Sequence, residues 1–90
     1  MLEGNVRVIN PLGLHARAAA QLVKLANRFS SKIIVKRLDN QTNAYANSIL
    51  GLLALAASTG TTLHLRVEGQ DEQLAFEAVE DIFSKGFGEI

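Results

Sequence analysis

The sequence predicts an α+β domain in which helices cover one face of a β-sheet, with the elements in the order βαββαβα. Three observations lead to this class. Apolar and polar residues alternate in several short segments, apolar residues recur at helical spacing in three others, and turn signals separate the segments. Strands of alternating polarity need cover on one face only, which amphipathic helices supply, so we expect two layers.

The chain opens with a strand followed by a helix. Residues 5–9 alternate in polarity, and the turn dipeptide Asn10-Pro11 ends the strand. After Gly13 the period changes to that of an amphipathic helix of about 12 residues. Its apolar stripe comprises Ala19, Leu22, Val23 and Ala26.

A hairpin and a second helix follow. Residues 32–38 are rich in β-branched side chains and end at an Asp-Asn turn signal, so we expect them to pair with a short strand at 41–44. Ser48 is then the expected cap of a short apolar helix, in which Ile49 and Leu52 should pack inward.

The last strand and helix carry the clearest patterns. Residues 61–67 alternate strictly between apolar and polar side chains, which predicts a strand with one face on the core and one in water. Asp71 is the expected cap of a last amphipathic helix, which Gly86 closes. Its apolar stripe comprises Leu74, Ala75, Ala78, Val79, Ile82 and Phe83. We interpret residues 1–90 as a single domain.

The composition narrows the classes of function. Nine basic residues balance nine acidic ones, which argues against nucleic acid as a partner because counterion release needs a concentrated basic face. The absence of cysteine rules out disulfides and thiolate chemistry. The two histidines have no carboxylate at metal-ligand spacing, so we expect neither a metal nor a cofactor.

No segment is typical of export or membrane insertion. The first ten residues lack a basic segment followed by an apolar run. The longest apolar run, residues 49–57, is far shorter than the roughly 20 residues that span a bilayer. We therefore expect a cytoplasmic protein with no membrane partner.

His15 stands at the expected start of the first helix, where Ser, Thr, Asp or Asn is the usual cap. An imidazole there would lie beside amide N–H groups without helical partners, at the end that carries about half a positive charge. Such a place attracts anions and disfavours protonation of the ring, so a ring nitrogen stays nucleophilic.

Neighbouring residues fit the same chemistry. Arg17 adds a guanidinium fork that matches phosphate oxygens, and Gly13 permits a backbone conformation that brings the chain close to the helix start. Together with His15 they predict a seat for a phosphoryl group carried on histidine. On spacing alone, a histidine and an arginine here are more often ordinary surface residues, so the pattern suggests the site without establishing it.

Several segments in order resemble the histidine-containing phosphocarrier (HPr) proteins of the bacterial phosphoenolpyruvate-dependent phosphotransferase system. The segments are LGLHARAAA at the first helix, ANSILGLLALAAS at the second and TGTTLHLRVEGQDEQLA before the last, and the match runs from about Val6 to Phe87. The resemblance implies an open-faced β-sandwich, in which three helices cover one face of a four-stranded antiparallel sheet.

The resemblance also implies a chemistry and its partners. Members of the family accept a phosphoryl group from the phosphohistidine of Enzyme I on Nδ1 of the histidine matching His15, and deliver it to a histidine of an Enzyme IIA-type protein. The arginine matching Arg17 assists, and the backbone amides of Ala16, Arg17 and Ala18 would bind the phosphate. The protein would be a monomeric phosphoryl-transfer intermediate with transient partners rather than a free-standing enzyme.

Two departures from the family pattern bear on the branch. The usual HARPA motif reads HARAA here, so Ala18 replaces the proline favoured in the first helical turn, and we expect the helix to survive. Asn47 precedes Ser48, where serine-regulated members often have lysine. These features, with Leu12 and the ending FSKGF at 83–87, resemble the nitrogen-related branch, which regulates metabolism. A sugar-uptake carrier is the alternative.

Three further residues carry hypotheses by resemblance. Ser48, a helix cap by position, would also be a regulatory phosphorylation site for an HPr serine kinase. Leu50 and Leu53 lie one helical turn apart, and would form an apolar docking patch near His15 if they point outward or belong to the core if they point inward.

Two other classes of function compete with a phosphoryl carrier. A regulatory docking module would keep the fold without phosphotransfer, but the pairing of His15 with Arg17 argues against it. A small nucleic-acid or metabolite-binding domain could share the topology, but the neutral charge and the lack of an aromatic platform argue against that class.

Overall fold

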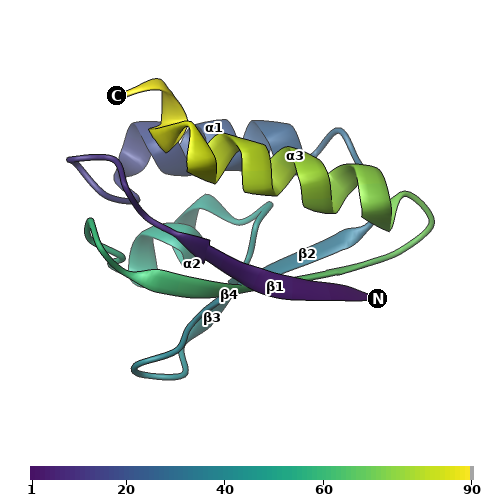
Figure 1. Cartoon of the computed structure of the whole chain (residues 1–90), viewed down its shortest axis with the longest axis horizontal. Helices are drawn as coiled ribbons and strands as arrows, with labels where there is room; N and C mark the ends of the chain where they lie inside the picture. The colour runs from purple at the N-terminus through teal and green to yellow at the C-terminus, as the bar shows by residue number, and fades with distance from the viewer. Residues whose placement is uncertain (90) are drawn as a thin grey trace.

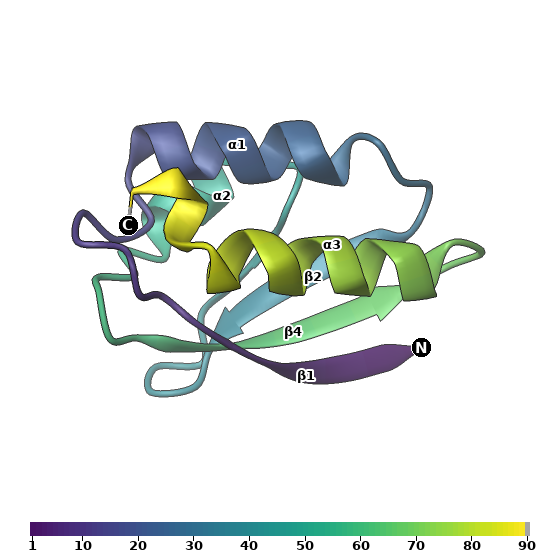
Figure 2. The same ribbon diagram turned by 45° about the horizontal axis from the view of Figure 1, so that its top comes forward.

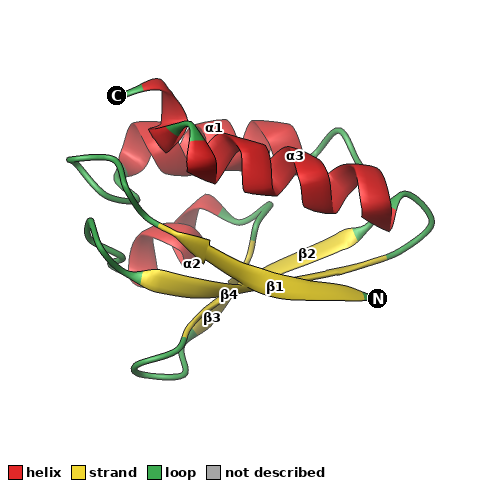
Figure 3. Cartoon of the chain, in the orientation of Figure 1, coloured by secondary structure: helices red, strands yellow, loops and turns green. Residues whose placement is uncertain are grey.

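The computed structural model describes residues 1–89, and its element order confirms the predicted βαββαβα arrangement (Figures 1 and 3). The strands are β1 (Leu2–Arg7), β2 (Lys32–Arg37), β3 (Asn43–Tyr45) and β4 (Thr62–Glu68). The helices are α1 (Ala16–Ala26), α2 (Ile49–Ala54) and α3 (Glu72–Ser84), and a 3₁₀ turn, η1 (Gly86–Gly88), follows α3.

The four strands form one antiparallel sheet in the order β1-β4-β2-β3. Both ribbon views show α1 and α3 side by side over one face of this sheet (Figures 1 and 2). The short helix α2 lies on the same side and packs against α1 and β3. The arrangement is therefore an open-faced sandwich of two layers, as the resemblance implies.

The core lies between the sheet and the helices. On the central strand β4, every second side chain, Leu63, Leu65 and Val67, is fully buried. The helices contribute the fully or almost fully buried side chains of Leu22, Leu52, Val79 and Phe83. This alternation confirms the strict two-residue period of the sequence, because only one face of the strand meets the helices.

Two apolar residues that the spacing assigned to the core lie on the surface instead. Leu74 is 66% exposed and Ile49 is 40% exposed. The buried stripe of α3 runs through Ala75, Val79 and Phe83, one residue every helical turn, and Leu74 lies about 100° around the helix from it. Ile49 is the first residue of α2, and only Leu52, one turn later, is buried.

Asp71 occupies the cap position of α3, but its side chain does not cap the helix. Its carboxylate instead accepts hydrogen bonds from the backbone amides of Ser30 and Ser31, each at 3.0 Å, and from the Ser31 hydroxyl. The side-chain capping role expected for Asp71 is therefore wrong. The carboxylate joins the start of α3 to the loop between α1 and β2, which a one-dimensional pattern cannot indicate.

Candidate functional site

His15 is the N-terminal cap of α1. Its backbone is extended (φ −79°, ψ −177°), and its carbonyl accepts the hydrogen bond of the Ala19 amide at 2.8 Å. The ring also caps the helix, because Nδ1 accepts a hydrogen bond from the Arg17 amide at 3.3 Å. A ring nitrogen thus takes the place that a Ser or Asp oxygen occupies at other helices, with its lone pair directed at backbone N–H groups.

The loop before α1 is anchored to the segment after α2. Gly13 has φ +69°, and a Cβ there would come within 2.8 Å of the Ala57 carbonyl oxygen. The next residue, Leu14, donates its amide to that carbonyl at 2.8 Å and buries its side chain. His15 follows directly, and its side chain remains 24% exposed. The imidazole is therefore fixed by its neighbours and still accessible.

The first turn of α1 offers the donors of an anion site. Hydrogen bonding within the helix begins at the Ala19 amide, so the N–H groups of Ala16 and Ala18 have no helical acceptor. The Arg17 side chain is exposed, and no hydrogen bond or ion pair joins its guanidinium to another residue of the described range 1–89. An anion beside Nδ1 would meet the positive end of the helix, and Arg17 of the same turn carries an exposed guanidinium.

Glu89 and Asn10, which the sequence analysis does not single out as site residues, complete this arrangement. Oε2 of Glu89 contacts Nε2 of His15. Its Oε1 accepts hydrogen bonds from the side-chain amide of Asn10 at 3.2 Å and the backbone amide of Leu12 at 3.3 Å. Glu89 lies 74 residues from His15, so no local spacing could have revealed it.

The contact with His15 sets the charge state of Glu89. Its hydrogen bond with His15 is the main cause that lowers the pKa of the Glu89 carboxyl below its ordinary value. Partial burial acts in the opposite direction, and the hydrogen bonds from Asn10 and Leu12 lower the pKa further. A carboxylate with only 12% of its side chain exposed therefore stays ionised against the ring.

The second helix presents the other three candidate residues. Ser48 caps α2, since its Oγ accepts a hydrogen bond from the Gly51 amide at 3.1 Å, which confirms the predicted cap. Leu50 is 78% exposed and Leu53 is 38% exposed, so both side chains reach solvent rather than the core. The segment that follows α2 binds the loop before His15 through the Ala57 carbonyl.

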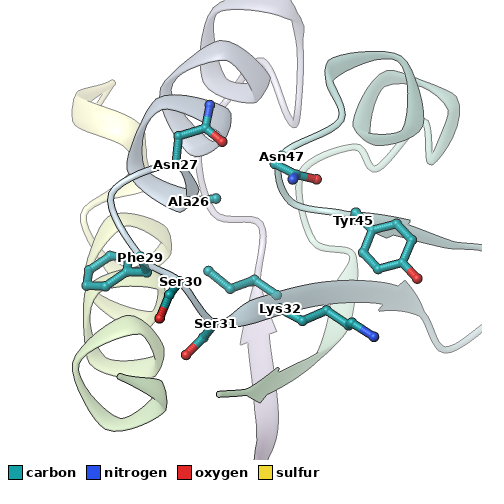
Figure 4. A pocket seen from close by; sticks show the side chains of 9 residues that line it. Ala26, Asn27, Phe29, Ser30, Ser31, Lys32, Tyr45 and Asn47 are labelled. Atoms are coloured by element: carbon teal, nitrogen blue, oxygen red, sulfur yellow. The ribbon is translucent and has the colours of Figure 1, made fainter. Parts of the chain in front are cut away.

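A hollow of about 440 Å³ lies at the far end of α1 from His15 (Figure 4). It is lined by the last residue of α1, the loop that follows, and residues of β2 and of the β3–α2 connection, among them Asn27, Ser30, Tyr45 and Asn47. None of the site residues around His15 lines it. It contains no histidine and lies apart from the first turn of α1, so it is not part of the site at His15.

The fold and the site define a class of protein, a small α+β domain that presents a histidine nitrogen at an anion-binding helix end. The model of the family described as "PTS HPr component phosphorylation site" matches residues 2–85. The chain therefore belongs to the HPr family of phosphocarrier proteins of the phosphotransferase system, as the resemblance indicated.

Individual relatives and structures agree with this assignment. The phosphocarrier protein HPr of Xylella fastidiosa is 42% identical over 89 residues, covering 99% of this chain and 98% of the relative. That of Treponema pallidum is 46% identical over 89 residues, covering 99% of each. The crystal structure of an HPr from Thermoanaerobacter tengcongensis matches with a TM-score of 0.92 at 39% identity, over 100% of this chain and 99% of that one. An HPr from Bacillus anthracis matches with a TM-score of 0.85 at 34% identity, over 91% and 95%.

Proposed function

We propose that the protein accepts a phosphoryl group on Nδ1 of His15 from the phosphohistidine of Enzyme I and passes it to a histidine of an Enzyme IIA-type protein. The observation that carries the proposal is the orientation of the ring. Nδ1 accepts a hydrogen bond from the Arg17 amide at the start of α1. Its lone pair is therefore directed toward the helix end, which attracts anions.

The transfer is an exchange of one phosphorus–nitrogen bond for another. The hydrogen bond from the Arg17 amide to Nδ1 breaks, and the freed lone pair of Nδ1 attacks phosphorus. The bond to the donor nitrogen breaks, and the donor imidazole keeps the electron pair. The amides of Ala16, Arg17 and Ala18 and the Arg17 guanidinium would meet the negative charge of the transferring oxygens. Positioning and charge stabilisation are the main contributions a protein makes to such a step.

Partners would dock on the exposed apolar side chains of α2. Leu50 and Leu53 are exposed, and the segment after their helix is hydrogen bonded to the loop that carries His15. An apolar patch near the phosphorylated residue suits a short-lived complex, because it adds binding energy without a fixed network of polar contacts. No metal or cofactor enters this mechanism.

A nitrogen-related regulatory phosphorelay is the branch that we propose. Its support is the sequence Ala46-Asn47-Ser48 and the ending at 83–87, together with the alanine at position 18. A carrier for sugar uptake is the alternative, and the similar relatives of Xylella fastidiosa and Treponema pallidum are named phosphocarrier protein HPr. Transfer assays with Enzyme IIA-type proteins from a nitrogen-related and from a sugar-uptake system would distinguish the two.

The remaining expectations stay proposals. Ser48 would be phosphorylated by an HPr serine kinase, since phosphate at a helix start beside the docking residues would repel an acidic partner without unfolding the helix. We propose a single domain over 1–90 and a cytoplasmic monomer, although dimers of an HPr from Thermoanaerobacter tengcongensis and of Crh from Bacillus subtilis have been solved. Over the described residues, no helix is both long and apolar enough to cross a bilayer.

Incubation with Enzyme I and phosphoenolpyruvate tests the carrier function. We expect an acid-labile, base-stable phosphate on the wild-type protein and none on His15→Ala. The matched control is His64→Ala, because His64 lies on the open face of the sheet and pairs with Glu3 there. Lack of label on the wild type with a competent Enzyme I would reject the carrier function in favour of a docking module.

A further inference from the structure

The end of the chain folds back onto His15. After α3, the turn η1 buries Phe87, whose ring packs edge-on against Phe83 with centroids 5.0 Å apart. Figure 2 shows this turn beside the loop that precedes α1. Phe87 thereby anchors the segment, and Glu89 follows two residues later with its carboxylate against the imidazole. The segment is therefore held by an apolar contact as well as by the contacts of Glu89.

We propose that Glu89 is a positioning residue for phosphoryl transfer, which holds the ring proton of His15 on Nε2 and so leaves Nδ1 unprotonated as the nucleophile. Both ring nitrogens of His15 have a partner. Nδ1 accepts from the Arg17 amide, so it carries a lone pair, and Nε2 faces a carboxylate oxygen, so it carries the hydrogen. This inference rests on the proposed function for its chemistry.

The position of the His15 ring proton decides which nitrogen can attack phosphorus. With the proton on Nε2, Nδ1 attacks phosphorus directly and no proton has to leave the nucleophile. The product is a ring phosphorylated on Nδ1 that still bears hydrogen on Nε2, and it therefore carries a positive charge. The Glu89 carboxylate faces that charge, so it stabilises the product as well as the reactive tautomer.

Asn10 holds Glu89 in turn. Its side chain is completely buried, and Nδ2 donates to the Gly13 carbonyl at 2.7 Å and to Glu89 Oε1 at 3.2 Å. Its Oδ1 has no hydrogen-bond partner among the described residues. An aspartate there would lack this N–H donor and would place a second carboxylate beside Glu89. The position therefore requires the NH₂ group of the asparagine, whereas its oxygen makes no contact of this kind.

The experiment compares Glu89→Gln and Glu89→Ala with the wild type. The proton of His15 is located by ¹⁵N NMR of the ring nitrogens, and kcat and KM for phosphorylation by Enzyme I are measured with this protein as the substrate. Glu3→Gln is the matched control, because Glu3 pairs with Nε2 of the other histidine, His64, at 2.9 Å.

We expect a single Nε2–H tautomer in the wild type and a mixture in Glu89→Ala. The value of kcat should fall by about tenfold in Glu89→Ala, by analogy with the lower end of the loss when a residue that orients a metal-ligating histidine is removed. KM should not change, since Leu50 and Leu53 remain intact. Glu89→Gln should keep the tautomer, because its amide oxygen can still accept, and lose rate because it carries no charge.

Three results would overturn the inference, and the first two concern the tautomer and kcat. One is an unchanged tautomer in Glu89→Ala, and the other is an unchanged kcat although the tautomer has become mixed. A fall in the apparent rate caused only by KM would assign Glu89 to docking and would also overturn it. If the wild type takes no label, the proposed function fails, and the NMR comparison still decides whether Glu89 sets the place of the ring proton.

Discussion

His15 can cap α1 because the backbone of the preceding loop has a fixed conformation. This conformation depends on Gly13, whose φ of +69° lies in the region that side chains with a Cβ rarely adopt. The Ala57 carbonyl occupies the space that a Cβ would need and accepts the Leu14 amide. The contact between the loop before α1 and the segment after α2 therefore also fixes the position of His15.

Gly13→Ala should lower the free energy of unfolding by more than the roughly 1–2 kcal/mol that a left-handed residue costs. The excess comes from the contact of 2.8 Å between the new Cβ and the Ala57 oxygen. Gly60→Ala is the matched control, because Gly60 also has a positive φ, +92°, but open space around its missing Cβ. Urea unfolding of both variants measures the difference, and equal losses would contradict the role of the clash.

Ser48→Ala should lower the free energy of unfolding by about 1 kcal/mol, the usual cost of losing an N-cap. The reason is the hydrogen bond that Ser48 Oγ accepts from the Gly51 amide at 3.1 Å. Ser48→Asp should stay close to the wild type in urea unfolding, since aspartate also caps. If both variants lose the same stability, the serine acts through packing instead.

Residue identity was predictable where the chemistry is local. His15 and Ser48 each act within a few residues of themselves, so their types and neighbours reveal their roles. For Gly13 the residue type indicates its backbone conformation, but not its contact with Ala57. Asn10 and Glu89 act through a contact that spans 79 residues of sequence, and nothing in either segment marks it. The half of the site that faces Nε2 could not be found without the fold.

At the scale of elements, each helix contributes a different group to the surface or to the contacts between loops. α1 presents its N-terminus, α2 presents exposed leucines, and the start of α3 is tied to the loop after α1 by Asp71. The strands of the sheet supply none of these groups. The helical layer is therefore the functional face, and the sheet is its support.

Leu50→Asp should raise KM for phosphorylation by Enzyme I at least about tenfold, because a charge in an apolar contact weakens a complex by more than a kcal/mol. The free energy of unfolding should stay unchanged, since Leu50 is 78% exposed. Leu74→Asp is the control, because Leu74 is 66% exposed on α3, away from α2. An equal rise of KM in both variants would mean that added charge, rather than its location, weakens the complex.

Asp71 should make stability depend on pH in the acid range. Hydrogen bonds from the Ser31 hydroxyl, foremost, and from the Ser30 amide lower the pKa of its carboxyl, with partial burial opposing. Because the folded pKa is the lower one, the unfolded chain takes up the proton first. The contribution is complete above the ordinary carboxyl range, near pH 4, and is lost as pH falls through the folded pKa.

Urea unfolding of the wild type and Asp71→Asn between pH 7 and pH 2 checks this. The wild type should be the more stable at pH 7, and the difference should shrink below about pH 4. A difference that stays constant with pH would show that the aspartate acts by its shape rather than by its charge.

Element boundaries were predictable in proportion to the strength of the local pattern. β4 was expected at 61–67 and spans Thr62–Glu68, since strict alternation leaves little freedom. β1 was expected to begin at residue 5 but begins at Leu2, because β4 offers a partner for each residue from Leu2 to Arg7. β3 was displaced from 41–44 to Asn43–Tyr45, as Gln41 has φ +63° and belongs to the turn.

For the molecule as a whole, one shared core supports every surface task. A domain of this size is stable by only about 5–15 kcal/mol, so a single large cavity removes a considerable fraction of its stability. Leu65 lies on the central strand with 0% exposure and is flanked by Gly4 of β1 and Val35 of β2 in the register of the sheet.

Leu65→Ala should lower the free energy of unfolding by about 2–5 kcal/mol, the usual range for a buried leucine. Leu74→Ala makes the same chemical change at a surface position and should cost less than about 1 kcal/mol. The midpoints of urea unfolding give both values. Comparable losses would contradict the layered core.

The start of β1 and the turn η1 lie at opposite ends of the molecule (Figures 1 and 2), which matters for anyone who labels or immobilises it. Because Glu89 touches His15, a fluorophore attached at Glu89 would lie beside the imidazole and crowd a visiting protein. The same label at Met1 would disturb the pair between its amine and Glu72 and the contact of its sulfur with Arg66, both far from His15. Labels are therefore better attached at the amino terminus.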